Sequence, residues 1–193
     1  MRKTQNFNWP ALSLGTCYYP EHWDKKLWRE DLRRMKENGI FTVRIAEFAW
    51  NKLEPREGEY TFDFFDSFLD VAEEEGMKVI FGTPTATPPV WLTEKYPEVL
   101  NCRLDGTPFR HGMRRHYNYN SPVYRKFCSI IVEKAAQHYG QRSCIVGWQI
   151  DNEINCEVDV FYSESDTAAF REFLKEKYQT LDALNEAWGT VFW

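Results

Sequence analysis

Hydrophobic and polar positions follow two alternating patterns along the 193 residues of the chain. Short apolar runs, typical of buried strands, are each followed by a stretch with apolar residues at helical spacing. The expected strands cover residues 12–19, 41–48, 78–83 and 144–150, the last apolar enough to be buried on both faces. Strands and helices that alternate in this way form a parallel sheet with crossover helices. The pattern therefore predicts an α/β fold.

The helical stretches between these strands carry their own start signals. Asp24 is placed to cap the first helix, Asp63 precedes the second, and Ser121 before a proline suits the start of the third. Two more helices are expected over about residues 167–178 and around residues 183–188. The long segment between the third strand and the third helix is rich in Pro, Tyr and Arg, and its length predicts a site-building insertion rather than a plain connector.

Four strand-and-helix units fill nearly the whole chain. A closed eight-fold barrel takes roughly 250 residues or more, so 193 residues are too few for a complete one. The length also limits the chain to one ordinary domain with a substantial core. We therefore expect a TIM (β/α)8 barrel of which only about the first four β/α units are present, with residues 1–193 as the truncated amino-terminal part of a single domain.

Composition and charge exclude several classes of partner. The net charge is −5 with both signs interspersed, which argues against a nucleic-acid partner. No apolar run is long enough to cross a bilayer, and the first residues lack the apolar core of a secretory signal. Five widely spaced cysteines without a C-x-x-C pair are typical of reduced thiols. These features predict a cytoplasmic protein with no nucleic-acid or membrane partner.

Aromatic residues make up 17% of the chain and include eight Trp. Many of the tryptophans stand beside turn residues or at strand ends rather than at core spacing. Because sugar rings stack on such flat apolar faces, this composition favours a carbohydrate site. A core that is merely rich in aromatic residues is the alternative explanation.

The sharpest chemical signal follows the fourth expected strand. Residues 150–153, Ile-Asp-Asn-Glu, place polar groups at the carboxyl end of the strand, which is the active face of a barrel. A carboxylic acid at that place can protonate a leaving glycosidic oxygen, so Glu153 is the candidate general acid/base. The alternative is that Asn152 or Glu153 merely ends the strand or caps the next helix.

Several segments of the chain resemble those of a known enzyme family. They are residues 17–23 (CYYPEHW), 44–50 (RIAEFAW), 83–92 (TPTATPPVWL), 114–117 (RRHY), 151–153 (DNE) and 185–193 (NEAWGTVFW). In this order they are similar to the successive strand-end motifs of the β-galactosidases of glycoside hydrolase family 42. The resemblance covers nearly the whole chain. It implies the amino-terminal part of a catalytic barrel domain that acts on β-galactosides with retention of configuration.

The resemblance also implies roles for four residues. Glu153 matches the general acid/base, while Asn152 and Arg114 match residues that hold hydroxyls of the galactose in the −1 subsite. An Asn can donate and accept at once to the 2-hydroxyl, and an Arg offers a rigid donor fork suited to vicinal oxygens. Trp193 matches a tryptophan that lines the sugar site. The alternatives are a solvated basic loop for Arg114 and a packed aromatic side chain for Trp193.

Glu47 has two open interpretations. It stands at the end of the second expected strand, where its carboxylate can reach the site or pair with Arg44. Of the two, the structural ion pair is favoured.

Some members of the family bind zinc through a cysteine after the Arg-Arg-His-Tyr motif and a cysteine cluster downstream of the catalytic Glu. Here Asn118 stands where the first cysteine is expected, and residues 161–167 contain none. Cys156 alone does not make a structural zinc site. We therefore expect no metal and no other cofactor.

A retaining glycosidase needs a second carboxyl group about 5 Å from the first. In the family this nucleophilic Glu ends the seventh barrel strand, beyond Trp193. None of Glu157, Glu164, Glu172 or Glu186 stands at a matching strand end. We therefore expect this chain alone to be inactive. The complete protein, a trimer as is common in the family, is expected to release terminal non-reducing β-D-galactose. A sibling glycosidase acting on arabinopyranosides and a non-catalytic sugar-binding half barrel remain the alternatives.

Overall fold

The computed structural model describes residues 13–113, 115–154, 156–158 and 160–190. These residues group into two compact units, the first within residues 1–91 and 128–154 and the second within 92–127 and 155–193. In chain order the strands, helices and short 3₁₀ helices (η) are β1 (Leu14–Cys17), η1 (Pro20–His22), α1 (Lys25–Glu37), β2 (Ile40–Ile45), α2 (Trp50–Leu53), α3 (Asp63–Glu74), β3 (Lys78–Gly82), η2 (Pro84–Ala86), α4 (Val90–Lys95), η3 (Pro97–Val99), α5 (Pro122–Tyr139), β4 (Ile145–Gln149), α6 (Glu164–Tyr178) and α7 (Leu181–Trp188).

The first unit is built on a four-stranded parallel sheet in the order β1-β2-β3-β4. Each strand pairs with the one before it in the sequence, as crossover helices between parallel strands require. Val43 and Phe81 of the two central strands are completely buried. By contrast, all of β1 is exposed and all of β4 is partly exposed. The expectation that the fourth strand is covered on both faces is therefore wrong for this chain, because β4 is an edge of the sheet.

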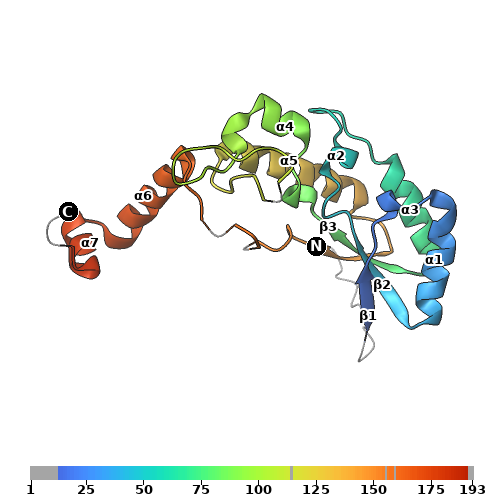
Figure 1. The fold of residues 1–193 in the computed structure, drawn as a ribbon. Coiled ribbons are helices and arrows are strands. Elements are labelled where there is room, and N and C mark those ends of the chain that lie inside the picture. Colours follow the sequence, from blue (N-terminus) through green and yellow to red (C-terminus); the bar gives the residue numbers. More distant parts are fainter. Residues whose placement is uncertain (1–12, 114, 155, 159, 191–193) are drawn as a thin grey trace. The chain divides into compact units, whose positions relative to one another are not determined.

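Helices α1 and α3 pack side by side in the first unit (Figure 1). Helix α1 begins directly after Asp24, as the sequence predicted. The Asp24 carboxylate caps the helix by accepting a hydrogen bond from the Lys26 N–H at 3.0 Å. Trp28 of α1 meets Phe68 of α3 edge to face, with 5.4 Å between ring centroids. The Trp28 indole also donates to the carbonyl oxygen of Pro20 at 3.1 Å, so this large ring is buried without leaving its N–H unpaired.

The expected strand ends differ from the observed ones. The second strand was expected to reach residue 48 but ends at Ile45, because Ala46 turns the chain with a φ of +74°. The short helix α2 then follows, which the apolar pattern did not indicate. At the other end of the chain α6 begins at Glu164, three residues earlier than expected. A capping box explains this start, since the Ser163 and Asp166 side chains each accept from the other's backbone N–H.

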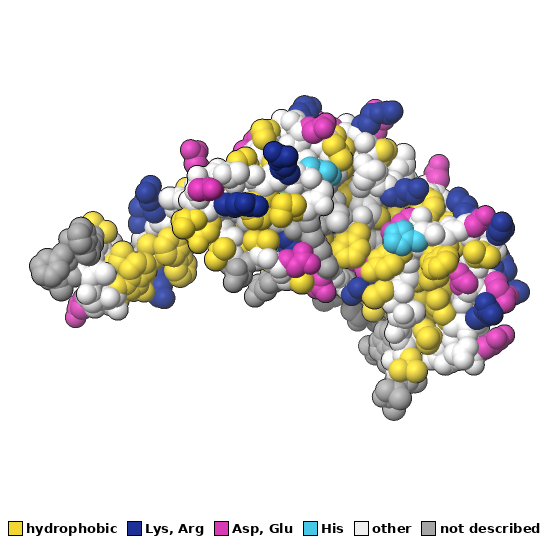
Figure 2. All heavy atoms as spheres, viewed as in Figure 1, with side chains coloured by type: hydrophobic (Ala, Val, Ile, Leu, Met, Phe, Trp, Pro, Cys, Tyr) yellow, Lys and Arg dark blue, Asp and Glu magenta, His cyan; other side chains and the backbone are white. Residues whose placement is uncertain are grey.

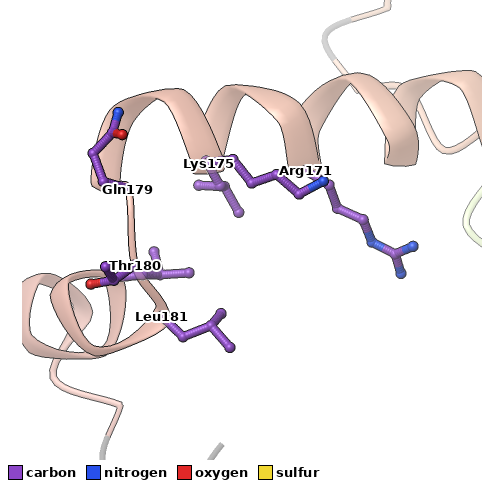
Figure 3. Close-up of a pocket in the computed structure, with 7 residues that line it drawn as sticks. Arg171, Lys175, Gln179, Thr180 and Leu181 are labelled. Carbon is purple, nitrogen blue, oxygen red and sulfur yellow. The ribbon is translucent and has the colours of Figure 1, made fainter.

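Apolar side chains are exposed along α6 and α7 of the second unit, where they appear as yellow spheres (Figure 2). Phe170 and Phe173 of α6 and Leu181 and Trp188 of α7 are each half exposed or more. A hollow of about 410 Å³ lies between the two helices and receives side chains from both, including Lys175 and Leu181 (Figure 3). These two helices therefore leave much of their apolar surface unburied. Among the described residues, no helix is both long and apolar enough to cross a membrane.

Candidate functional site

Polar side chains from four strand ends meet at the carboxyl edge of the sheet in the first unit. Tyr19 follows β1, Glu47 follows β2, Thr85 follows β3 and Asp151 follows β4. Parallel strands all end at this edge, so residues far apart in the sequence become neighbours. The Tyr19 hydroxyl donates to Glu47 Oε1 at 2.9 Å, and the Thr85 hydroxyl donates to Asp151 Oδ2 at 2.8 Å. These two hydrogen bonds join the ends of β1 and β2 and the ends of β3 and β4 in pairs.

The turn after β4 has an unusual backbone. Asp151 and Glu153 have φ values of +55° and +44°, in a region that side-chain-bearing residues seldom adopt. The Asp151 N–H donates to the Thr83 hydroxyl at 2.7 Å, and the Asn152 N–H donates to Asp151 Oδ1 at 2.6 Å. The bonds to Thr83 and Thr85 therefore tie the turn to the end of β3, and the third bond lies within the turn. Backbone strain of this kind persists only where the surroundings hold it, and it is common at functional sites.

The Glu47 carboxylate is fully buried and its charge is balanced by Arg44. Arg44 Nη2 lies 2.9 Å from Glu47 Oε1, and Arg44 Nε donates to the same oxygen at 3.0 Å. Glu47 Oε2 is also buried and has no hydrogen-bond partner within the part of the chain that the structure describes. The expected ion pair is thus confirmed. Burial, helped by the hydrogen bond to Glu47, raises the pKa of Tyr19 to about 12, so this hydroxyl stays a donor.

Two backbone features allow Glu47 to lie close against the end of β3. Ala46 has a φ of +74°, which turns the chain sharply at the end of β2. Gly82, the last residue of β3, lies so close that a Cβ atom there would be 2.6 Å from the Cβ and 2.8 Å from the Cα of Glu47. Only a glycine allows this approach.

Gln149, the last residue of β4, connects the ion pair to the turn that follows it. Arg44 Nη1 donates to Gln149 Oε1 at 2.8 Å. On its other side, Gln149 Nε2 donates to the carbonyl oxygen of Asp151 at 2.9 Å and to Asn152 Oδ1 at 3.1 Å. One continuous hydrogen-bonded path therefore runs from Glu47 to Asn152.

The structure places two of the four candidate site residues in this unit. Asn152 is buried and Glu153 is exposed, and both follow β4 directly. Neither caps the next helix, because the N-cap of α6 is Ser163, so the capping interpretation is wrong. Arg114 and Trp193 lie outside the described residues.

Thr83, Thr85 and Gln149 were not expected to take part in the site. The sequence carried a weak signal for each, since Thr83 and Thr85 begin the segment after β3 and Gln149 precedes the Asp-Asn-Glu motif. The contacts of Thr83 and Thr85 with Asp151, and of Gln149 with Arg44, join residues that lie 66 to 105 positions apart along the chain. Contacts over such separations follow from the strand order and not from any local pattern.

A second polar cluster lies within the second unit, around Asn118. The completely buried Asn118 amide donates to Asp166 Oδ2 at 2.8 Å, to Ser165 Oγ at 3.0 Å and to Ser163 Oγ. Asn120 donates to the other oxygen of Asp166 at 2.8 Å. Asn118 therefore takes part in a hydrogen-bonded cluster at the position where zinc-binding relatives were expected to have a cysteine. Among the described residues, no group of three or more His, Cys, Asp or Glu could hold a metal ion.

Comparisons with known proteins agree with this arrangement. A family model described as β-galactosidase, glycoside hydrolase family 42, matches residues 17–193. The chain is 49% identical over 181 residues to a β-galactosidase of Thermus thermophilus, covering 93% of this chain and 28% of that protein. It is 42% identical over 183 residues to β-galactosidase Bga of Halorubrum lacusprofundi, covering 94% and 26%. The chain thus spans about a quarter of the length of these relatives.

Solved structures give the same result for the fold. The chain is similar to the β-galactosidase of the psychrophilic Marinomonas ef1, with a TM-score of 0.89 at 46% identity, covering 94% of this chain and 28% of that one. Similarity to the β-galactosidase of Halorubrum lacusprofundi has a TM-score of 0.90 at 41% identity, with 94% and 27% covered. The four parallel strands and their helices are therefore part of a TIM barrel, as expected. The chain belongs to the β-galactosidase family, glycoside hydrolase family 42.

Proposed function

We propose that the complete protein is a retaining β-galactosidase in which Glu153 is the general acid/base. The observation that carries the proposal is the placement of Asn152 and Glu153 directly after β4, on a turn held by Thr83, Thr85 and Gln149. The carboxyl ends of barrel strands are where active sites form in this fold. Family membership supports β-galactosides as the substrates.

In the proposed reaction, Glu153 first donates its proton to the departing glycosidic oxygen and later takes a proton from the attacking water. The second carboxylate, which forms the glycosyl-enzyme intermediate, belongs to the part of the complete protein outside this chain. Asn152 holds the 2-hydroxyl of the galactose, where the hydrogen bond strengthens as the oxocarbenium-like transition state develops. Arg114 and Trp193 complete the contacts to the sugar from this chain. The complete protein is also proposed to be a homo-oligomer.

The acid/base role can be tested in the complete protein with Glu153→Gln. Proton donation matters most for poor leaving groups, so kcat/KM for phenyl β-D-galactoside is expected to fall by about 10²-fold to 10⁴-fold. The loss is expected to be much smaller for 2,4-dinitrophenyl β-D-galactoside, whose leaving group needs no proton. Glu157→Gln, which removes an exposed carboxylate four residues away, is the matched control and should leave both rates near wild type.

Wild-type activity of Glu153→Gln on the phenyl galactoside would exclude this role. Retention is tested separately by nuclear magnetic resonance of the first-formed anomer, which should be β-galactose. An α-galactose product would instead indicate an inverting mechanism. Comparison of kcat/KM for nitrophenyl β-D-galactoside and α-L-arabinopyranoside distinguishes the galactosidase from the arabinopyranosidase alternative.

A further inference from the structure

We infer that Glu47, Arg44 and Gln149 fix the direction of the Asn152 amide, so that Asn152 presents its nitrogen, and therefore only hydrogen-bond donors, to the substrate. This inference rests on the proposed function, because it assumes that Asn152 faces the 2-hydroxyl of the sugar. Gln149 is then a positioning residue. Asn152 distinguishes sugars by whether their substituent at C2 can accept a hydrogen bond.

The direction of the Gln149 amide follows from its two neighbours. A guanidinium has donors and no acceptor, so the Gln149 atom that lies 2.8 Å from Arg44 Nη1 must be the oxygen. A backbone carbonyl only accepts, so the atom 2.9 Å from the Asp151 carbonyl oxygen must be the nitrogen. Both neighbours require the same orientation of the Gln149 amide.

The direction of the Asn152 amide follows in turn from Gln149. Gln149 Nε2 lies 3.1 Å from Asn152 and can only donate to it, so the Asn152 atom at this contact must be Oδ1. The oxygen of Asn152 is thereby used inside the unit. What the side chain has left to offer elsewhere is Nδ2, which carries two N–H donors and no acceptor.

Glu47 is the origin of this chain of constraints. Its buried carboxylate binds both Nε and Nη2 of Arg44, which directs the remaining Nη1 toward Gln149. Charge-assisted contacts of this kind are shorter and stronger than neutral ones, so Arg44 is held more firmly than Gln149 or Asn152. The Glu47 carboxylate at the end of β2 therefore determines, through Arg44 and Gln149, which atom of the Asn152 amide faces outward.

The affinity for a sugar should therefore depend on how well its substituent at C2 accepts a hydrogen bond from Asn152 Nδ2. A hydroxyl can accept from Nδ2, a fluorine accepts weakly, and a hydrogen does not accept at all. Neutral, non-hydrolysed phenyl 1-thio-β-D-galactosides with OH, F or H at C2 make suitable probes. Their inhibition constants against nitrophenyl galactoside hydrolysis can be measured in the complete protein.

For the wild-type protein we expect the 2-fluoro probe to bind more tightly than the 2-deoxy probe. Gln149→Glu keeps an acceptor for Arg44 but turns a second oxygen toward Asn152, which forces the amide to rotate and to present Oδ1 outward. The 2-fluoro probe should then bind more weakly than the 2-deoxy probe, and the ratio of their inhibition constants should change about tenfold. Gln149→Met is the matched control. Like Gln149→Glu it removes the hydrogen bond to the Asp151 carbonyl oxygen, but it places no acceptor beside Asn152. Its ratio of inhibition constants should lie between those of the wild type and Gln149→Glu.

Asn152→Asp provides a second test that leaves Gln149 intact. One oxygen keeps the contact to Gln149 and the other takes the place of Nδ2, so the same inversion of the fluoro and deoxy probes is expected even if Gln149→Glu does not fold. An unchanged order of the two probes in the folded variants would overturn the inference. A wild-type protein that hydrolyses no galactoside would instead refute the proposed function, so the two failures are distinguishable.

Discussion

The Thr85 hydroxyl donates to Asp151 Oδ2 at 2.8 Å, joining the end of β3 to the strained turn after β4. We expect Thr85→Val to destabilise the complete protein by about 1–3 kcal/mol, because the buried Asp151 carboxylate loses a donor. The turn that carries Glu153 should loosen as well, so kcat should fall more than KM rises. Chemical denaturation and steady-state kinetics measure the two effects.

Thr42→Val is the matched control for this substitution. The Thr42 hydroxyl in β2 is buried and has no hydrogen-bond partner among the described residues, so its removal should leave stability unchanged or raise it. If the Thr42 and Thr85 variants lost equal stability, the Thr85 contact would not be what holds the turn.

Gly82→Ala should be strongly destabilising, although it adds only one carbon atom. The new Cβ would lie 2.6 Å from the Cβ of Glu47 and 2.9 Å from its nitrogen, and backbone cannot move away cheaply. We expect a loss of about 1–3 kcal/mol or more, together with lower activity because Glu47 shifts. Gly147→Ala in β4 is the control, since the nearest atom there is 4.0 Å away. Similar melting temperatures for the two variants would contradict the close packing of Gly82 on Glu47.

Acid should destabilise the protein partly through His116. Burial lowers the pKa of His116, and His111 lowers it further, whereas the hydrogen bond to the Met113 carbonyl oxygen opposes the shift. His116 of the unfolded chain therefore takes up its proton at a higher pH than His116 of the folded chain. Well above pH 6.5 His116 has no effect on the free energy of unfolding, and below that pH it lowers this free energy increasingly.

His116→Gln should remove this contribution. The free energy of unfolding, measured with urea between pH 7.5 and 5.5, should fall less steeply for the variant than for wild type. The difference in slope is at most about 1.4 kcal/mol per pH unit, the value for one proton. His22→Gln, at an exposed site, is the control. Parallel slopes for wild type and His116→Gln would contradict the prediction.

Asn118→Asp should show how strongly the polar cluster of the second unit depends on its amide. The substitution removes the donor to Asp166 and sets two carboxylates against each other where Asn118 is completely buried. We expect a loss of about 3–5 kcal/mol at neutral pH, partly recovered in acid, where one carboxyl group of the pair takes up a proton. Asn120→Asp faces the same Asp166 from a partly exposed position and should cost less. Equal melting temperatures for the two variants would argue against this account.

The chain by itself should show no turnover of nitrophenyl β-D-galactoside, because the proposed mechanism takes its nucleophilic carboxylate from the part of the complete protein outside this chain. The exposed β1 and the apolar surface of α6 and α7 should also make it aggregate more readily than the complete protein. Activity assays and light scattering on purified residues 1–193 test both points. Galactoside turnover by this chain alone would disprove the first.

The order of the elements could be predicted from the sequence, and the reason is local. A strand is indicated by a run of apolar residues, and a helix start by a capping residue such as Asp24 or Ser121. Both signals lie in residues that are adjacent in the sequence, so a single sequence reveals them. The Asp-Asn-Glu motif after the fourth strand was also visible, because a polar run that ends an apolar strand points to the active face of a barrel.

The details of the candidate site could not be predicted in the same way. The residue types of Ala46 and Glu153 give no indication of their positive φ, because neither type favours that region of the backbone map. The contact between Arg44 and Gln149 spans 105 residues, and it exists only once the sheet has formed. Such contacts depend on strand register, which follows from the packing of the whole unit.

The strand order β1-β2-β3-β4 has a consequence for how the protein is made. A ribosome releases the chain from its amino terminus, and here each new strand finds its pairing partner in the strand released just before it. The sheet can therefore grow one β/α unit at a time during synthesis, without waiting for a distant segment. The residues of the polar edge are synthesised in the same order. Arg44 and Glu47 lie three positions apart and leave the ribosome almost together, whereas the Asp-Asn-Glu turn follows only after its partners Thr83 and Thr85.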